Sequence, residues 1–99
     1  MLFVTAQPEF LAAAAADLQA IGAAMSQAFA GAAPTTAVMP PAGDPVSAML
    51  AARFVAHAGL CQTMGAQGLA IHENAVNTLG ANAGSYAAAE VANAALAAS

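Results

Sequence analysis

His57 and Cys61 are the two side chains in this sequence whose types and spacing come nearest to a chemical site. They stand four residues apart, on one face of a helix, and could form half of a metal site or a cysteine–histidine nucleophile. A zinc site needs three or four ligands, and a catalytic cysteine needs a third group that orients its base. The next candidates, His72 and Glu73, lie about three helical turns away, which is too far to complete either arrangement.

These residues therefore favour structural roles. We interpret Cys61 as a small core residue and His57 as an interfacial histidine bonded to a partner protein. His72 and Glu73 are adjacent and point to different faces of a helix, so we expect a solvated or partner-facing pair. Nothing supplies an acid, a base and a pocket together. The sequence predicts no enzyme, no catalytic residue, no metal, no cofactor and no small-molecule substrate; Cys61, the single cysteine, allows no internal disulfide.

Tyr86 and Glu90 form a different kind of pair. Tyr86 is the only tyrosine, and the two residues stand one helical turn apart in a field of alanine. An exposed phenol beside a carboxylate could be read by a receptor groove. The alternative interpretation is that Tyr86 only covers the end of a helical bundle while Glu90 is solvated.

Arg53 is the only lysine or arginine, against five carboxylates, so the net charge is −4. Nucleic-acid binding requires several phosphate-neutralising cations, and a membrane-active amphipathic helix requires a basic polar face. The composition excludes both. In an interface with almost no other charge, a guanidinium must find an acceptor. We therefore expect Arg53 to make a salt bridge to a partner or to keep its head exposed.

No segment reads as a membrane span, because Asp17 interrupts the alanine-rich stretch 11–30, and Arg53 with His57 interrupts 46–61. The absence of Lys and Arg before position 53 also predicts no cleavable secretory signal peptide of the ordinary kind.

The elements that must position these side chains are helices. Alanine is the best helix former and β-branched residues are sparse, so the fold class is all-α. A first helix is predicted over about 8–30, with Pro8 at its first position and Glu9 favoured by the helix dipole. It is expected to stop at a proline-rich connector, residues 31–44, that packs down onto the helices through Val38 and Met39.

A second helix is predicted over about 45–80, with Asp44 as its N-cap and Pro45 at its first position. Residues 81–99 are expected to form a C-terminal segment, in which residues 85–99 could still be helical but should fray. The 99 residues make one domain.

Large apolar residues follow helical spacing on both segments. The second segment carries two stripes, one from Leu50 through Cys61 to Ile71 and another from Leu69 through His72 to Leu79. Two stripes exceed what one neighbouring helix can cover, so we expect a partner protein to complete a bundle. The residues predicted for that partner interface are Leu11, Leu18, Ile21, Met25, Phe29, Leu50, Phe54, Met64 and Ile71. Which of them face the chain's own second helix and which face the partner stays open.

Three features together resemble the mycobacterial PE family, which is named for a Pro-Glu pair. They are Pro8-Glu9 near the N-terminus, the connector "TTAVMPPAGDPVSA", and the late pair Tyr86 and Glu90 in a Tyr-x-x-x-Glu pattern. The resemblance covers essentially the whole chain. It departs in Leu2, where serine is common in the family.

The resemblance implies an antiparallel two-helix hairpin that completes an elongated four-helix bundle with a PPE protein, as a 1:1 heterodimer. It implies export of the pair through a type VII secretion system to the cell envelope or outside the cell, with Tyr86 and Glu90 as part of the export signal. It also implies that an EspG-type chaperone contacts the tip of the PPE partner and not this chain.

A second hypothesis is a self-assembling structural protein. Two copies of the hairpin would form a four-helix homodimer with no role in export. Light scattering of the isolated chain would separate this hypothesis from the heterodimer.

Overall fold

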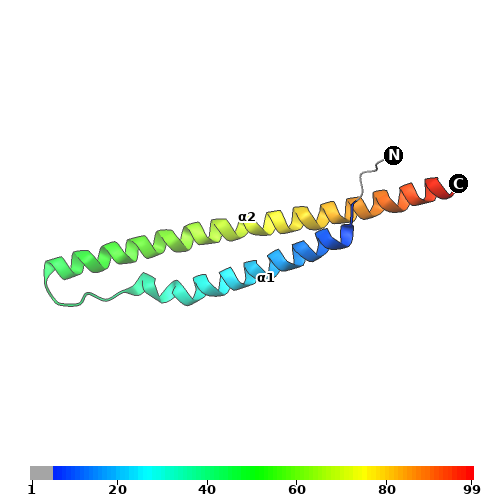
Figure 1. The fold of residues 1–99 in the computed structure, drawn as a ribbon. Coiled ribbons are helices and arrows are strands. Elements are labelled where there is room, and N and C mark those ends of the chain that lie inside the picture. The colour runs from blue at the N-terminus through cyan, green and yellow to red at the C-terminus, as the bar shows by residue number, and fades with distance from the viewer. Residues whose placement is uncertain (1–5) are drawn as a thin grey trace. The chain divides into compact units, whose positions relative to one another are not determined.

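The computed structural model describes residues 6–99. The elements in order are helix α1 (Pro8–Ala32), the short 3-10 helix η1 (Ala33–Ala37) and helix α2 (Pro45–Ala98) (Figure 1). No strand occurs among the described residues, so the chain is all-α. The chain divides into two compact units. Unit 1 comprises Met1–Ile21, of which residues 6–21 are described, together with His72–Ser99; unit 2 comprises Gly22–Ile71.

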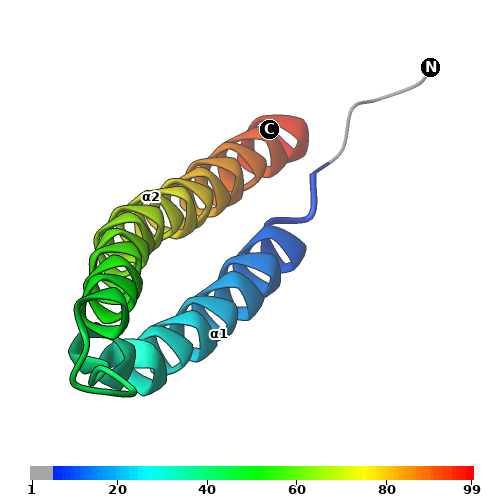
Figure 2. The ribbon, with the colours of Figure 1, turned by 90° about the vertical axis from the view of Figure 1, so that its left-hand side faces the viewer.

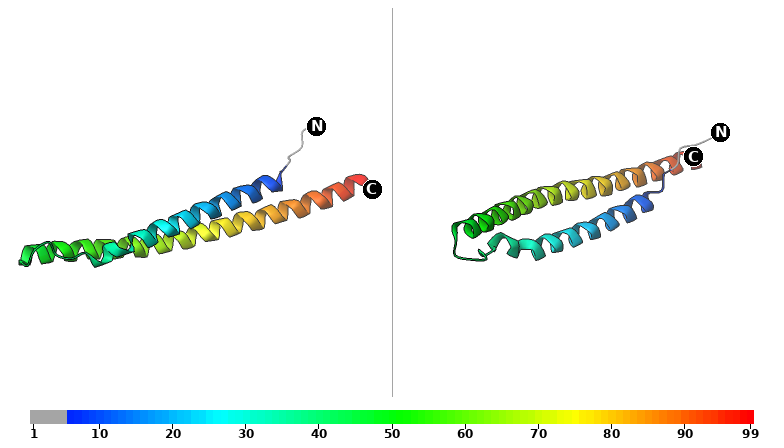
Figure 3. Two further views of the ribbon diagram at one scale, coloured as in Figure 1. Left: turned by 90° about the horizontal axis from the view of Figure 1, so that it is seen from below. Right: turned by 60° about the vertical axis from the view of Figure 1, so that its left-hand side comes forward.

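Within each unit, a segment of α1 lies beside a segment of α2 and runs in the opposite direction (Figures 1 and 3). In unit 2 the chain passes from α1 through η1 and the connector into α2 (Figure 2). The predicted antiparallel helical hairpin is confirmed. A partner that would complete a bundle is a separate question.

The start of α2 is fixed by Asp44. Its Oδ1 accepts a hydrogen bond from the backbone N–H of Ser47 at 2.8 Å, and its Oδ2 accepts one from the Ser47 hydroxyl at 2.8 Å. The backbone carbonyl of Asp44 also accepts the N–H of Ala48, which is the first bond of the helix. Pro45 occupies the first helical position, where its missing N–H costs nothing. This is the N-cap arrangement that the sequence indicates.

The end of α2 differs from the sequence-based expectation. We expected the helix to end near residue 80, but α2 continues to Ala98 and includes Gly80 and Gly84. No described glycine has a positive φ, so neither residue turns the chain out of the helix. Each interior glycine costs about 1 kcal/mol relative to alanine. The alanine-rich sequence on both sides offsets that cost.

The connector also differs from expectation. Instead of packing down, Met39 leaves 81% of its surface exposed and Val38 leaves 40% exposed. The threonines of η1 bond locally, from Thr35 Oγ1 to the carbonyl of Ala32 and from Thr36 Oγ1 to that of Ala33. These bonds stabilise a further short helical segment after α1.

The surface between the two helices, which we call the seam, has small side chains at its most buried positions and half-buried larger ones around them. Among residues 6–99, the buried apolar side chains are all alanines, namely Ala15, Ala51, Ala58 and Ala83. No large side chain in the described part of the chain is fully buried. Small residues allow two helices to approach closely but provide little apolar area to bury.

In the seam of unit 2, the backbone of Gly65 lies close to the ring of Phe29. A Cβ placed at Gly65 would lie 2.5–2.8 Å from ring carbons of Phe29. The side-chain amide of Gln62 donates a hydrogen bond of 2.9 Å to the backbone carbonyl of Phe29. That carbonyl is one of the last four of α1, which have no regular partner within the helix. Phe29 is therefore held by contacts to both its ring and its backbone.

In the seam of unit 1, His72 is half-buried, and its Nε2 donates a hydrogen bond to the backbone carbonyl of Leu18. A carbonyl only accepts, so Nε2 carries a hydrogen in this contact. This finding corrects the expectation of a solvated or partner-facing His72. Its neighbour Glu73 is exposed.

We predict opposite effects from one substitution at two nearby glycines of α2. Gly65→Ala should destabilise unit 2, because its Cβ would overlap the Phe29 ring. Gly68→Ala, whose Cβ would meet nothing within 4 Å, should stabilise the helix by about 0.5–1 kcal/mol. Thermal melts followed by circular dichroism under identical conditions would compare them. Equal shifts for the two variants would contradict the close Phe29–Gly65 contact.

The Asp44 cap predicts a pH dependence. The N–H and hydroxyl of Ser47, donating to the carboxylate, hold the pKa of Asp44 below its ordinary value. A lowered pKa in the folded state means that the cap stabilises α2 above about pH 4 and is lost as the pH falls through the folded value. An NMR titration of the Asp44 carboxyl carbon should show the lowered pKa. Ser47→Ala should raise it, and the chain in urea should give the ordinary value.

Candidate functional site

The nine residues predicted for the partner interface fall into two groups. Those in α1 at seam positions are half-buried against the chain's own second helix: Leu11, Leu18, Met25 and Phe29. The other five are exposed, by 47–70% of their surface: Ile21, Leu50, Phe54, Met64 and Ile71. The half-buried residues follow the 3–4 spacing of a helix that packs against one neighbour. The exposed group is available for a second neighbour.

The two stripes of α2 also separate. Leu69, His72, Val76 and Leu79 are half-buried and belong to the seams of their units. The stripe that begins at Leu50 and ends at Ile71 lies in unit 2 and is exposed apart from Gly68. By this burial, the later stripe faces α1 and the earlier stripe faces away from it.

Seven large apolar residues of α2, all in unit 2, make up what we call the apolar face. They are Val46, Met49, Leu50, Phe54, Leu60, Met64 and Ile71, each with 47–73% of its surface exposed. At about 100° per residue, they occupy an arc of roughly 140° of the helix surface. The sequence analysis did not select Val46, Met49 and Leu60, although their helical spacing from Leu50 and Phe54 could have identified them.

The apolar face lies on one side of the unit 2 hairpin. In an antiparallel pair of helices, the residues that precede the seam positions lie on the same side for both helices. In α2 these include Leu50 and Phe54, and in α1 they are Ala24 and Ala28. On this side of unit 2, exposed small residues of α1 therefore stand beside exposed large residues of α2.

The opposite side of unit 2 carries little apolar bulk. The α2 residues that follow the seam positions include Ala52, Ala66 and Ala70, all exposed. A surface of alanine provides little area to bury in an interface. The two sides of the same hairpin therefore differ in what they can bind.

Arg53 and His57 lie within the apolar face, one turn apart, and both are exposed. The Nε2 of His57 is 3.6 Å from the sulfur of Cys61, which is also exposed. The interpretation of Cys61 as a core residue is therefore wrong, because position 61 belongs to the stripe that faces away from α1. In the part of the chain that the structure describes, no group of three or more His, Cys, Asp or Glu residues could hold a metal ion.

Tyr86 and Glu90 both lie in α2, within unit 1, and both are exposed. The two side chains differ in their surroundings. The Tyr86 phenol leaves 51% of its surface exposed, whereas Glu90 lines a shallow groove. The helix around them is regular, so the pair stands on an ordered α2 and not on a frayed tail.

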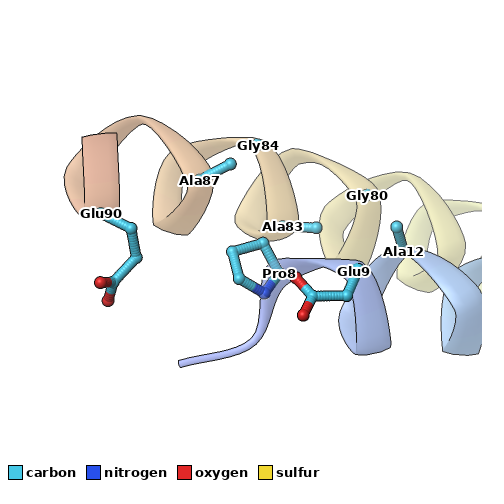
Figure 4. Close-up of a pocket in the computed structure, with 8 residues that line it drawn as sticks. All are labelled: Pro8, Glu9, Ala12, Gly80, Ala83, Gly84, Ala87 and Glu90. Carbon is cyan, nitrogen blue, oxygen red and sulfur yellow. The ribbon is translucent and has the colours of Figure 1, made fainter. Parts of the chain in front are cut away.

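The groove has a volume of about 580 Å³ and is formed by both helices of unit 1 (Figure 4). Its lining residues are Pro8, Glu9 and Ala12 of α1 with Gly80, Ala83, Gly84, Ala87 and Glu90 of α2. In Figure 4, Pro8 lies between the carboxylates of Glu9 and Glu90. Glu90 thus shares one surface with the Pro8-Glu9 pair, whereas Tyr86 is not among the lining residues. Sequence reasoning did not connect them, because the connection depends on α2 continuing past residue 80.

No helix among the described residues is long and apolar enough to cross a membrane.

Comparisons with known proteins identify the family to which this chain is similar. A sequence profile of the PE family matches residues 4–93. The chain is 57% identical to PE family protein PE13 of Mycobacterium tuberculosis, over 98% of this chain and 99% of that protein. It is also 52% identical to Esterase PE16 and 50% identical to PE family protein PE8 of the same species.

Those last two relatives are longer. The match with Esterase PE16 covers 97% of this chain but 18% of that protein. The match with PE8 covers 36% of that protein. The esterase name therefore describes a protein most of which has no counterpart in this chain. All three matches extend over nearly the whole of this chain. The chain belongs to the PE family of mycobacterial proteins.

Proposed function

We propose that this chain is a non-enzymatic interaction module that pairs one-to-one with a PPE-family protein and carries an export signal for a type VII secretion system. The observation that carries the proposal is the apolar face of unit 2, seven large side chains that the chain's own helices leave exposed. Membership of the PE family directs the choice of partner.

The energetics of the seam favour a partner. The buried apolar residues of the described chain are alanines, which contribute little hydrophobic free energy. Each large side chain of the apolar face would contribute roughly 1–2 kcal/mol on complete burial, because 47–73% of its surface is still exposed. Contiguous exposed apolar surface of this kind is typical of protein interaction sites. The partner's helices would supply the apolar contacts that the seam lacks.

The proposed export signal is the surface that presents Tyr86 and Glu90. Both are held on ordered helix, and Glu90 lines the groove beside Pro8 and Glu9. Secretion machinery would read the exposed phenol and carboxylate, and the complex would reach the cell envelope or the outside of the cell. An EspG-type chaperone would bind the tip of the PPE partner, leaving this chain uncontacted.

If a PPE-family partner binds the apolar face, a new charge on that face should weaken the complex, whereas a new charge on the alanine side of α2 should not. Co-expressed with a PPE-family partner, the chain should elute as a 1:1 complex by size exclusion with light scattering. Phe54→Asp places a carboxylate in the apolar face and should reduce co-purification at least about tenfold, because the charge would be desolvated. Ala70→Asp, on the alanine side of α2, is the matched control and should pair normally. A stable homodimer that ignores every PPE protein would favour the self-assembly hypothesis.

If Tyr86 and Glu90 form an export signal, substituting them should block secretion of the complex without affecting its formation. Tyr86→Ala and Glu90→Ala should each leave the complex intact in cell lysates and remove it from the culture filtrate, because neither residue belongs to the apolar face. Glu73→Ala, an exposed carboxylate on the same helix, controls for loss of surface charge and should be exported. Immunoblots of lysate and filtrate would measure both quantities. Normal secretion of both Tyr86 and Glu90 variants would exclude this surface as the signal.

A further inference from the structure

We infer that the partner presents a carboxylate to Arg53, and that this ion pair selects among partners and fixes the register of the complex. The inference rests on the proposed pairing through the apolar face. It adds the chemistry of the surface that must lie opposite.

Arg53 stands at the middle of the apolar face and not at its edge. At about 100° per residue, its position falls within roughly 30° of the midline of the arc formed by the seven apolar residues. Met49 and Leu50 lie one turn before it, and Leu60 lies about two turns after it; these three side chains are 47–63% exposed. A partner that covers them also covers the surface around Arg53.

A covered guanidinium needs an acceptor. Arginine stays charged in proteins and carries five N–H donors in a planar fork. Removing those donors from water without replacement is strongly unfavourable, whereas a carboxylate can accept two of them side by side. An apolar partner surface alone would therefore bind this face poorly. The favourable complement is an apolar helix with one Asp or Glu placed opposite position 53.

The chain itself does not supply that carboxylate within unit 2. Between residues 22 and 71 the only acidic residue is Asp44, whose two oxygens accept hydrogen bonds from Ser47. It also lies nine residues before Arg53, roughly 13 Å along the helix axis. Within unit 2, a second copy of the chain would bring no acid other than its own Asp44. Charge therefore favours a different protein as the source of the carboxylate.

The test uses the purified complex of the full chain with its PPE-family partner. Arg53→Glu should weaken the complex at least about thirtyfold in dissociation constant, as expected for a broken buried ion pair. Arg53→Gln keeps a polar side chain without the charge and should give a smaller loss. Ala70→Glu adds a carboxylate on the alanine side of α2 and should change the affinity less than about threefold. Circular dichroism would confirm that each variant is as helical as the unaltered chain.

Charge exchange identifies the partner residue. Each Asp and Glu on the apolar helical surfaces of the partner is replaced by Arg and combined with Arg53→Glu. One such replacement should restore binding to within about tenfold of the unaltered pair, while weakening binding to the unaltered chain.

The outcomes separate the two proposals. Normal pairing of the unaltered chain, with Arg53→Glu binding as tightly as Ala70→Glu, would overturn the ion pair and leave the pairing intact. In that case, the aliphatic part of the Arg53 side chain would extend along the interface and keep the guanidinium in solvent. Failure of the unaltered chain to bind any PPE-family protein would overturn both.

Discussion

The constraint on which this structure depends is the small size of the most buried side chains between its two helices. At Gly65 an added Cβ would meet the Phe29 ring at 2.5–2.8 Å, so the ring would have to move. Shape therefore restricts this part of the seam to a small residue. Leu69 of α2 is half-buried in the seam, whereas Leu50, Phe54 and Met64 remain outside it. The apolar face consists of large residues that the seam does not take in.

The same constraint explains how far the sequence predicts the fold. Helical spacing, the Asp44–Pro45 start and the two stripes of α2 could all be read directly, because large apolar residues and caps produce strong signals. The residues of the seam could not be identified from the sequence, because alanine fits seam and surface positions equally well. This is why Leu69 and His72, which face α1, could not be distinguished from Leu50 and Phe54, which face away. Only the pairing of the helices separates them.

The end of α2 shows a second limit. Gly80 and Gly84 suggest a stop, whereas the alanine-rich sequence on both sides favours a helix, so local propensity alone does not fix where α2 ends. In the structure both glycines are helical, and Ala83 beside them is among the few buried residues of the described chain. Packing of that alanine in unit 1 supplies a non-local contribution that single-residue propensities omit. Because the helix continues, Glu90 reaches the groove beside Pro8 and Glu9, and residues distant in the sequence share one surface.

Charge placement then determines what kind of assembly this hairpin suits. A self-complementary face would carry both members of any ion pair, since each residue on one copy must find its complement on the other. Unit 2 places its one cation at the middle of its apolar face, and its one carboxylate is already committed to the α2 cap. Two copies meeting through this face would bury two guanidiniums, and their unit 2 segments would supply no uncommitted carboxylate. The apolar residues alone would permit a homodimer, but Arg53 makes it unfavourable, and the same residue favours an acidic partner.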